Sequence, residues 1–271
     1  MADPALFRSE DGFMVPTGLT RGGWSDEAQH GSPPVGLLAR AVERQPTSVP
    51  MQVVRLTVDL FREVPLTPLS IETEVLREGL RIQLVQVRLL AGSRQVGQAQ
   101  GLKIRMADLG PAAGEIGVPE ATVEVPAPGP EELEVLDWRE VFGDDQELPR
   151  FHNDAVEIRT VDHSFVEPVV GVSWFRLKVR LVEDEELTPF QRVALVSDLA
   201  NGNSQALDPR RWLFVNPDLT LYLHRYPIGE WLCMRSGVAQ SPNGIGVTDS
   251  VLYDQGGPVG RINQAQLIDH R

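Results

Sequence analysis

The chain has 271 residues, of which 42% are hydrophobic and 23% charged, as expected for a globular protein with one large domain or two of ordinary size. Its formal net charge of -13 argues against general nucleic-acid binding, because phosphate backbones are held by clustered Lys and Arg. A single cysteine, Cys233, permits no intrachain disulfide. With no signal-peptide pattern and no long apolar segment, we expect no membrane span and a cytoplasmic protein.

The first half of the chain predicts one helix followed by an antiparallel meander. Ser32 suits the N-cap of a helix over residues 32–44, Pro33 suits its first position, and Pro46 ends it. Alternating, β-branched segments follow, with connections too short for parallel crossovers. We expect these strands at residues 51–61, 69–76, 82–90 and 96–104. A helix and a meander predict a two-layer α+β unit over residues 1–108.

Residues 109–150 differ in composition and predict a linker. The segment is rich in Pro, Gly, Ala and Glu, a composition typical of a connection rather than a packed core. It would join the first unit to a second unit at residues 151–271.

The second half repeats the order of the first. A helix is expected over residues 190–201, with Thr188 as its cap and Pro189 at its first position. Strands are expected before it at residues 156–161 and 174–182, and after it at 212–223, 231–238, 246–253 and 259–268. At a constant offset of 163, five residues of the first half meet identical ones in the second: Thr57, Leu60, Arg62, Val96 and Gly97. The repeat indicates duplication of one unit, and two such sheets can pair edge to edge.

Several strings in this frame resemble one family. The run Asp218–Arg225, followed by Pro227 and Gly229-Glu230-Trp231-Leu232, resembles the second hotdog unit of type II acyl-CoA thioesterases. Ser197–Asn201 resembles their helix motif, and Leu252–Gln264 resembles their closing hairpin. In the first half, the string His30-Gly31-Ser32-Pro33-Pro34 resembles thioesterase-like members of the family.

The resemblance implies a double hotdog fold of the α+β class, with two antiparallel sheets each wrapped around a central helix. It implies hydrolysis of acyl-CoA without a cofactor, and by analogy a homodimer or higher homo-oligomer. It also implies a site in which an aspartate, a hydroxyl residue and a glutamine hold the attacking water. The aspartate corresponds to Asp198 and the glutamine to Gln264, whereas Asn216 occupies the hydroxyl position and Thr220 is a nearby hydroxyl.

The residues themselves support Asp198 as a candidate general base. It lies in an apolar helical run, where a carboxylate costs free energy unless it is paired or useful, and a carboxylate can accept a proton from water. The alternative is that Asp198 faces solvent or pairs with Arg192. Asn201 lies three residues further on the same side, as a candidate substrate-binding residue. For Gln264 the alternative is an ordinary polar residue on a solvated face.

His30 precedes the first helix in a Gly/Pro loop, where it could line the mouth of the site or cap the helix. The five histidines show no metal-ligand spacing, and no G-x-S-x-G or nucleotide-binding pattern occurs, so we expect no metal. No histidine follows Asp198 at the spacing of hotdog hydratases. At the matched offset the first unit has Val35 and Gly101, which predicts one working site per chain. A non-hydrolytic protein that binds acyl-CoA or an acyl chain is the second hypothesis, motivated by Asn216.

Overall fold

The computed structural model describes residues 4–117, 124–139, 148–162, 170–204 and 207–271. In its first half the predicted helix and four strands are confirmed, with small shifts at their ends. They are α1 (Ser32–Arg44), β3 (Met51–Leu60), β4 (Leu69–Arg77), β5 (Ile82–Ala91) and β6 (Arg94–Arg105). Two strands that we did not predict precede them, β1 (Ala5–Glu10) and β2 (Phe13–Pro16).

The second half also follows the predicted order. Its elements are β7 (Val156–Asp162), β8 (Gly171–Leu177), β9 (Arg180–Val182), α3 (Pro189–Ser197), α4 (Ala200–Asn203), β10 (Trp212–Val215), β11 (Asp218–Leu223), β12 (Leu232–Ser241), β13 (Ile245–Asp254) and β14 (Gly257–His270). Short helical turns lie at Gly18–Thr20, Gly110–Glu115, Pro130–Glu132 and Phe151–Ala155. None of the described helices is long and apolar enough to cross a membrane.

Three predicted elements of the second half are interrupted. The strand expected at 174–182 divides into β8 and β9, so that β9 can pair with β1 of the first half. The helix expected at 190–201 is broken after Ser197, where Asp198 forms the C-cap of α3. The strand expected at 212–223 is broken at Asn216 and Pro217, because proline has no N–H to donate to a strand ladder. Two of these breaks fall at predicted site residues.

The two halves have the same strand order, which confirms the duplication. The first half-sheet runs β1-β2-β4-β5-β6-β3 and the second runs β7-β8-β12-β13-β14-β11. The strands β3 and β11 pair antiparallel and place Thr57 opposite Thr220, two residues that the repeat had matched.

The two half-sheets thus pair edge to edge, as the sequence analysis allowed, through β3 and β11. In the described residues 14 strands form one continuous sheet, because edge pairing satisfies backbone groups that an open edge would leave exposed. The pairing of β1 with β9 is parallel, so the sheet is mixed.

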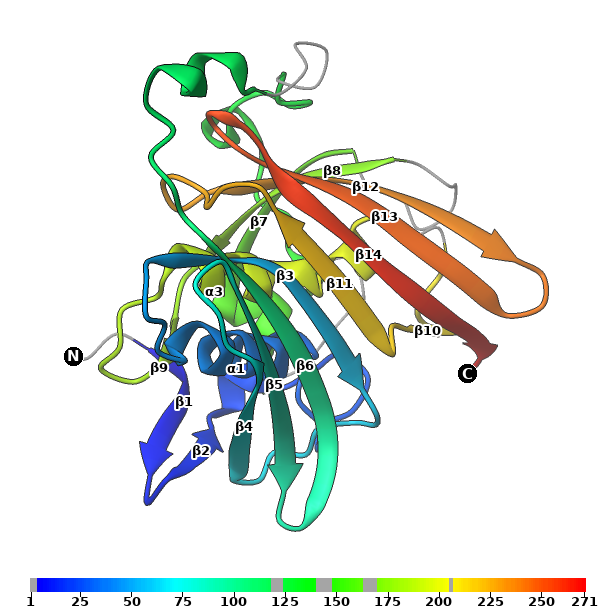
Figure 1. The fold of residues 1–271 in the computed structure, drawn as a ribbon. Coiled ribbons are helices and arrows are strands. Elements are labelled where there is room, and N and C mark those ends of the chain that lie inside the picture. Colours follow the sequence, from blue (N-terminus) through cyan, green and yellow to red (C-terminus); the bar gives the residue numbers. More distant parts are fainter. Residues whose placement is uncertain (1–3, 118–123, 140–147, 163–169, 205–206) are drawn as a thin grey trace.

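The helices lie side by side against this sheet (Figure 1). The helix α1 contacts β3 to β6, whereas α4 contacts β8 and β12 to β14. A Cβ atom at Gly36 of α1 would lie only 2.7 Å from a side-chain carbon of Leu195 in α3, so the close approach of the helices requires glycine there. A Cβ atom at Gly31, the N-cap of α1, would lie 2.6 Å from the carboxylate of Asp198. The packing therefore brings the start of α1 against the end of α3.

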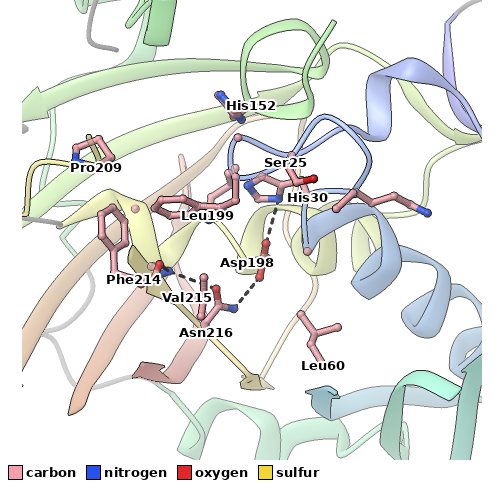
Figure 2. A pocket seen from close by; sticks show the side chains of 18 of the residues that line it. Ser25, His30, Leu60, His152, Asp198, Leu199, Pro209, Phe214, Val215 and Asn216 are labelled. Atoms are coloured by element: carbon pink, nitrogen blue, oxygen red, sulfur yellow. Dashed lines mark hydrogen bonds and ion pairs between the residues drawn. The ribbon is translucent and has the colours of Figure 1, made fainter. Parts of the chain in front are cut away.

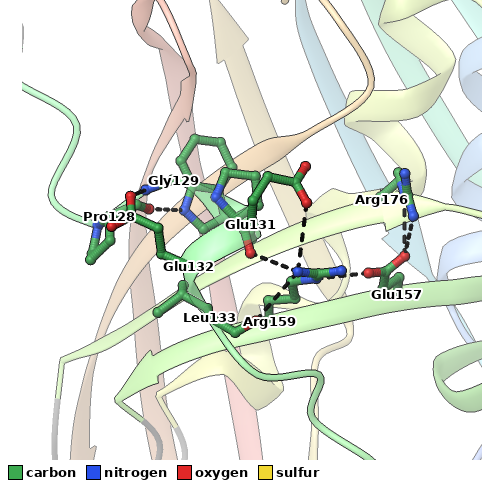
Figure 3. Close-up of polar contacts among 10 residues, drawn as sticks. Pro128, Gly129, Glu131, Glu132, Leu133, Glu157, Arg159 and Arg176 are labelled. Carbon is green, nitrogen blue, oxygen red and sulfur yellow. Dashed lines mark hydrogen bonds and ion pairs between the residues drawn. The ribbon is translucent and has the colours of Figure 1, made fainter.

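The described part of the predicted linker packs on the second half. Trp174 donates a hydrogen bond to the carbonyl of Pro128 at 2.8 Å, and Arg159 donates to the carbonyls of Pro130 and Leu133 (Figure 3). Beneath it lies a small apolar cluster that contains Trp231 and Cys233. Burial raises the pKa of the Cys233 thiol to about 12, so the thiol stays protonated and packs as a buried structural group.

Candidate active site

Asp198 is buried at the junction of the two halves and is only 5% exposed. Asn216 donates to its Oδ1 atom at 2.7 Å, and Nδ1 of His30 lies 3.0 Å from its Oδ2 atom (Figure 2). The Ser32 hydroxyl donates to the same Oδ2 atom at 3.5 Å. Arg192 instead donates to the carbonyl of Gly229. The alternative that Asp198 faces solvent or pairs with Arg192 is therefore wrong.

The electrostatics keep Asp198 ionised. Burial raises its pKa, but the hydrogen bonds from His30, Asn216 and Ser32 favour the charged form and bring the pKa below its ordinary value. The positive end of the α1 dipole, next to Gly31, acts in the same direction. The site thus holds a buried carboxylate that can accept hydrogen bonds near neutral pH.

His30 bonds through Nδ1, which is close to two partners. The same atom lies 3.0 Å from Asp198 and 3.1 Å from the backbone nitrogen of Ser32. A single ring nitrogen cannot both donate a hydrogen bond to the Asp198 carboxylate and accept one from the Ser32 N–H. The bond to the carboxylate is charge-assisted and is therefore the stronger of the two. We therefore assign a proton to Nδ1 of His30.

The first turn of α1 corrects the expected cap. Gly31, and not Ser32, is the N-cap, because the Ser32 side chain points across to Asp198. Pro33 and Pro34 follow and have no N–H groups. Gly31 lines the cavity described below, whereas Ser32 is fully buried and is not among the lining residues.

A chain of amides fixes the direction of Asn216. The Asn201 side chain donates to the Asn216 oxygen at 3.3 Å and to the carbonyl of Phe214 at 3.1 Å. Gln266 in turn donates to the Asn201 oxygen at 2.5 Å and to the Thr248 hydroxyl at 3.0 Å. Gln266 was not predicted as a site residue, although its position two residues after Gln264 places both on one strand face.

Gln264 is buried. The alternative that it is an ordinary polar residue on a solvated face is therefore wrong. Its amide donates to the carbonyl of Ser197 at 3.4 Å, one residue before Asp198. Its Oε1 atom has no hydrogen-bond partner in the described part of the chain. Gln264 is not among the residues that line the cavity described below.

Thr220 lies apart from Asp198. Its hydroxyl is 3.4 Å from that of Thr57 across the β3–β11 pair, and Leu219 and Leu221 on either side of it are fully buried. Alternation along a strand therefore turns Thr220 to the other face. In a continuous strand over residues 212–223, Asn216 and Thr220 would share one face. The break at Pro217 separates them into different elements, so this relation no longer holds.

A cavity of about 620 Å³ opens at Asp198, a size in the range of small-molecule sites. Both halves and the described linker line it (Figure 2). Its apolar wall includes Trp24, Leu60, Leu136, Trp138, Phe175 and Phe214. Its polar wall includes His30, Ser173, Asp198, Asn201, Asn203 and Asn216. In the described residues no group of His, Cys, Asp or Glu is arranged to hold a metal ion.

His152 also lines the cavity and was missed as a site residue. Its ring lies 6.0 Å from that of His30, centroid to centroid. Burial, together with the nearby charges of His30, Arg150 and Arg139, lowers the pKa of His152 to about 3. It is therefore neutral at physiological pH. No sequence signal distinguished it from the other histidines, because its place depends on how the second half packs on the loop before α1.

The first half lacks a counterpart of this carboxylate. The helix of the first half begins at Ser32 and that of the second half at Pro189. The helices are therefore separated by fewer residues than the constant offset that relates the strands, so Val35 is not the counterpart of Asp198. Gly101 does correspond to Gln264, but it leaves room for Val42 of α1, whereas Gln264 contacts Ser197.

Comparisons with known proteins agree with this architecture. A hotdog-fold protein of unknown function from Alicyclobacillus acidocaldarius is 16% identical, with a TM-score of 0.72 over 97% of this chain and 95% of that one. An acyl-CoA thioesterase II from Mycobacterium marinum is 16% identical, with a TM-score of 0.65 over 90% of each chain. Comparison with curated proteins gives no match.

The sequence also matches two family profiles. Residues 20–106 match the acyl-CoA thioesterase N-terminal domain and residues 124–268 match the acyl-CoA thioesterase C-terminal domain. The second match includes the part of the linker that packs on the second half. Since the two matches cover most of the sequence, the chain belongs to the acyl-CoA thioesterase family, as its motifs had predicted.

Proposed function

We propose that the cavity hydrolyses acyl-CoA thioesters to the free acid and CoA, with a water molecule activated at Asp198. The observation that carries the proposal is a buried, ionised carboxylate in the wall of a cavity large enough for an acyl group. Membership of the family supports thioester hydrolysis in general, and the geometry around Asp198 supports this mechanism.

In this mechanism the carboxylate of Asp198 orients the water and accepts its proton as the oxygen attacks the thioester carbon. The developing oxyanion is stabilised by the positive end of the α1 dipole at Gly31, a residue of the cavity wall. The tetrahedral intermediate then expels the CoA sulfur, which takes the proton from Asp198. The carboxylate is thereby restored and the acyl group leaves as the acid.

The neighbouring side chains hold the base in place. The Asn216 amide is oriented by Asn201 and donates to Asp198, so it positions the carboxylate rather than the water. His30 holds the other carboxylate oxygen, and it also faces the cavity, where it can contact the substrate. Gln264 does not line the cavity, and it holds the backbone carbonyl of Ser197, one residue before Asp198, rather than the water.

The cationic groups for CoA would lie in the same cavity wall. Arg62, Arg210 and Arg271 line it, and the guanidinium of Arg271 lies 5.0 Å from the ring of Trp24. Arg210 is already paired with Asp208 at 3.0 Å. We therefore expect Arg62 and Arg271 to contribute most to holding the phosphates.

Replacement of Asp198 by Asn tests the mechanism. We expect turnover of a panel of acyl-CoAs to fall by roughly 100- to 10,000-fold, the usual contribution of a general base. Asp218→Asn is the matched control, since Asp218 accepts a hydrogen bond from Ala265 at an exposed position. Undiminished turnover in Asp198→Asn would refute the role of the carboxylate.

The second candidate function is binding of acyl-CoA without cleavage. It is favoured by Asn216, which supplies no hydroxyl to the water. Calorimetry that detects binding while no free CoA appears would select this function over hydrolysis.

A cytoplasmic location and a homo-oligomer also stay predictions, and light scattering of the purified chain checks the oligomeric state.

A further inference from the structure

The linker at residues 128–139, which we call the strap, is fastened to the second half at both ends. At one end Trp174 donates a hydrogen bond to the carbonyl of Pro128 at 2.8 Å. At the other end Arg139 donates to the carboxylate of Asp154 at 2.6 Å. Because both ends are bonded to the same half, the segment between them is held against that half.

Between these ends the strap runs along β7, which ends the strand order of the second half-sheet. The N–H of Leu136 donates to the carbonyl of Ile158 in β7 at 2.8 Å. Extended backbone turns successive side chains to opposite sides, and burial alternates accordingly. Leu136 and Trp138 are half-buried, whereas Asp137 and Arg139 are exposed. The two inward side chains, Leu136 and Trp138, both line the cavity.

A row of rings leads from Asp198 to the strap. The His30 ring, which is bonded to Asp198, lies 6.0 Å from the ring of His152, and that ring lies 6.2 Å from the ring of Trp138. Burial lowers the pKa of His152 to about 3, so this histidine is neutral near pH 7. The side chains that line this end of the cavity are therefore uncharged: Leu136, Trp138, His152, Ile158 and Phe175.

A second row of rings leads from the site to a cation. Phe214 lies in a different direction from Asp198 than His152 does (Figure 2). The ring of Phe214 lies 5.1 Å from that of Trp24, over which the guanidinium of Arg271 lies at 5.0 Å. A thioester held at Asp198 extends both ways, so its phosphates fit the cationic end and its apolar chain fits the uncharged end.

We propose that the strap is the end wall of the acyl subsite, and that Leu136 and Trp138 set the longest acyl chain that the cavity accepts. The inference rests on the proposed function, because it divides the cavity at Asp198 between the acyl chain and CoA. A longer chain has to displace a wall that backbone hydrogen bonds and an ion pair hold in place.

The length limit should move when the wall is cut back. One methylene in a hydrophobic pocket changes kcat/KM by roughly 10-fold or more. Trp138→Ala opens space at the end of the subsite. We therefore expect its kcat/KM to rise by roughly 10-fold for chains just longer than the wild-type limit. Leu136→Ala should act in the same direction, and Trp138→Phe should lie between Trp138→Ala and the wild type.

The test measures kcat/KM of the purified full chain on a series of saturated acyl-CoAs of increasing length. Val135→Ala is the matched control, because Val135 lies on the strap beside Leu136 but is 58% exposed and does not line the cavity. Leu60→Ala cuts back the wall in another direction from Asp198 (Figure 2). Circular dichroism and thermal unfolding check that each variant is folded.

We expect the length limit to increase in Trp138→Ala and to stay unchanged in Val135→Ala. If Trp138→Ala fails to fold, Trp138→Phe and Leu136→Ala decide. An unchanged limit in the strap variants, or an increase in Leu60→Ala alone, overturns the inference while hydrolysis stands. If the wild type cleaves no thioester, the proposed function fails. Calorimetry on the same series then tests the inference by itself, and it is overturned if Trp138→Ala binds long chains no more tightly than the wild type.

Discussion

Replacement of Asn216 by Ala removes the shortest hydrogen bond to Asp198, 2.7 Å from nitrogen to carboxylate oxygen. A hydrogen bond to a charged group contributes about 1.5–3 kcal/mol, and the carboxylate left behind is buried. Asn201 loses one acceptor but keeps the carbonyl of Phe214. If the bond orients the carboxylate in the transition state, kcat/KM should fall by roughly 10- to 150-fold.

The same change has a pH signature. Because the lost bond favoured the ionised form, the pKa of Asp198 rises, and the acid limb of the kcat/KM profile moves to higher pH. The assay is CoA release across a pH series. Asn263→Ala is the matched control, since Asn263 donates to the carboxylate of Asp249 at 2.8 Å on an exposed face. A variant with reduced turnover and an unmoved acid limb would show that Asn216 does not act through Asp198.

Two further predictions concern the cavity wall. Gly31→Ala places a Cβ atom 2.6 Å from the Asp198 carboxylate, so we expect turnover to fall at least 10-fold. The control Gly237→Ala has open space around its Cβ atom and should keep full activity. Equal rates in the two variants would contradict the close approach of Gly31 to Asp198. The folded-state pKa of His152 is lowered from 6.5 to about 3, so the unfolded state binds the proton first, and stability falls as the pH drops from about 6.5 toward 3. Denaturant unfolding should show this slope, up to about 1.4 kcal/mol per pH unit, and His152→Gln should reduce it; an unchanged slope would count against the buried neutral ring.

Local patterns in the sequence determined much of the fold. The helix α1 and the strands β3 to β6 follow from periodicity and turn residues, which depend on neighbours along the chain. The duplication followed from repeated order and spacing, and the shared strand order confirms it. The burial of Asp198 could also be anticipated, because its helical neighbours are apolar.

The face that each site residue presents could not be predicted from local patterns. Asn216 and Thr220 have the spacing of one strand face, but the break at Pro217 turns Asn216 to Asp198 and leaves Thr220 beside Thr57. A period of two holds only while the strand continues.

The assembly of the site was decided by tertiary packing. Ser32 and Asp198 are 166 residues apart in sequence, and no local pattern indicates that they share a hydrogen bond. They meet because α1 and α3 pack closely, so that the start of one helix lies against the end of the other. The sequence by itself thus determined the two units and one buried carboxylate. Only the packing of those units decided that His30 and Ser32 of the first half, with Asn216 of the second, surround that carboxylate in a cavity.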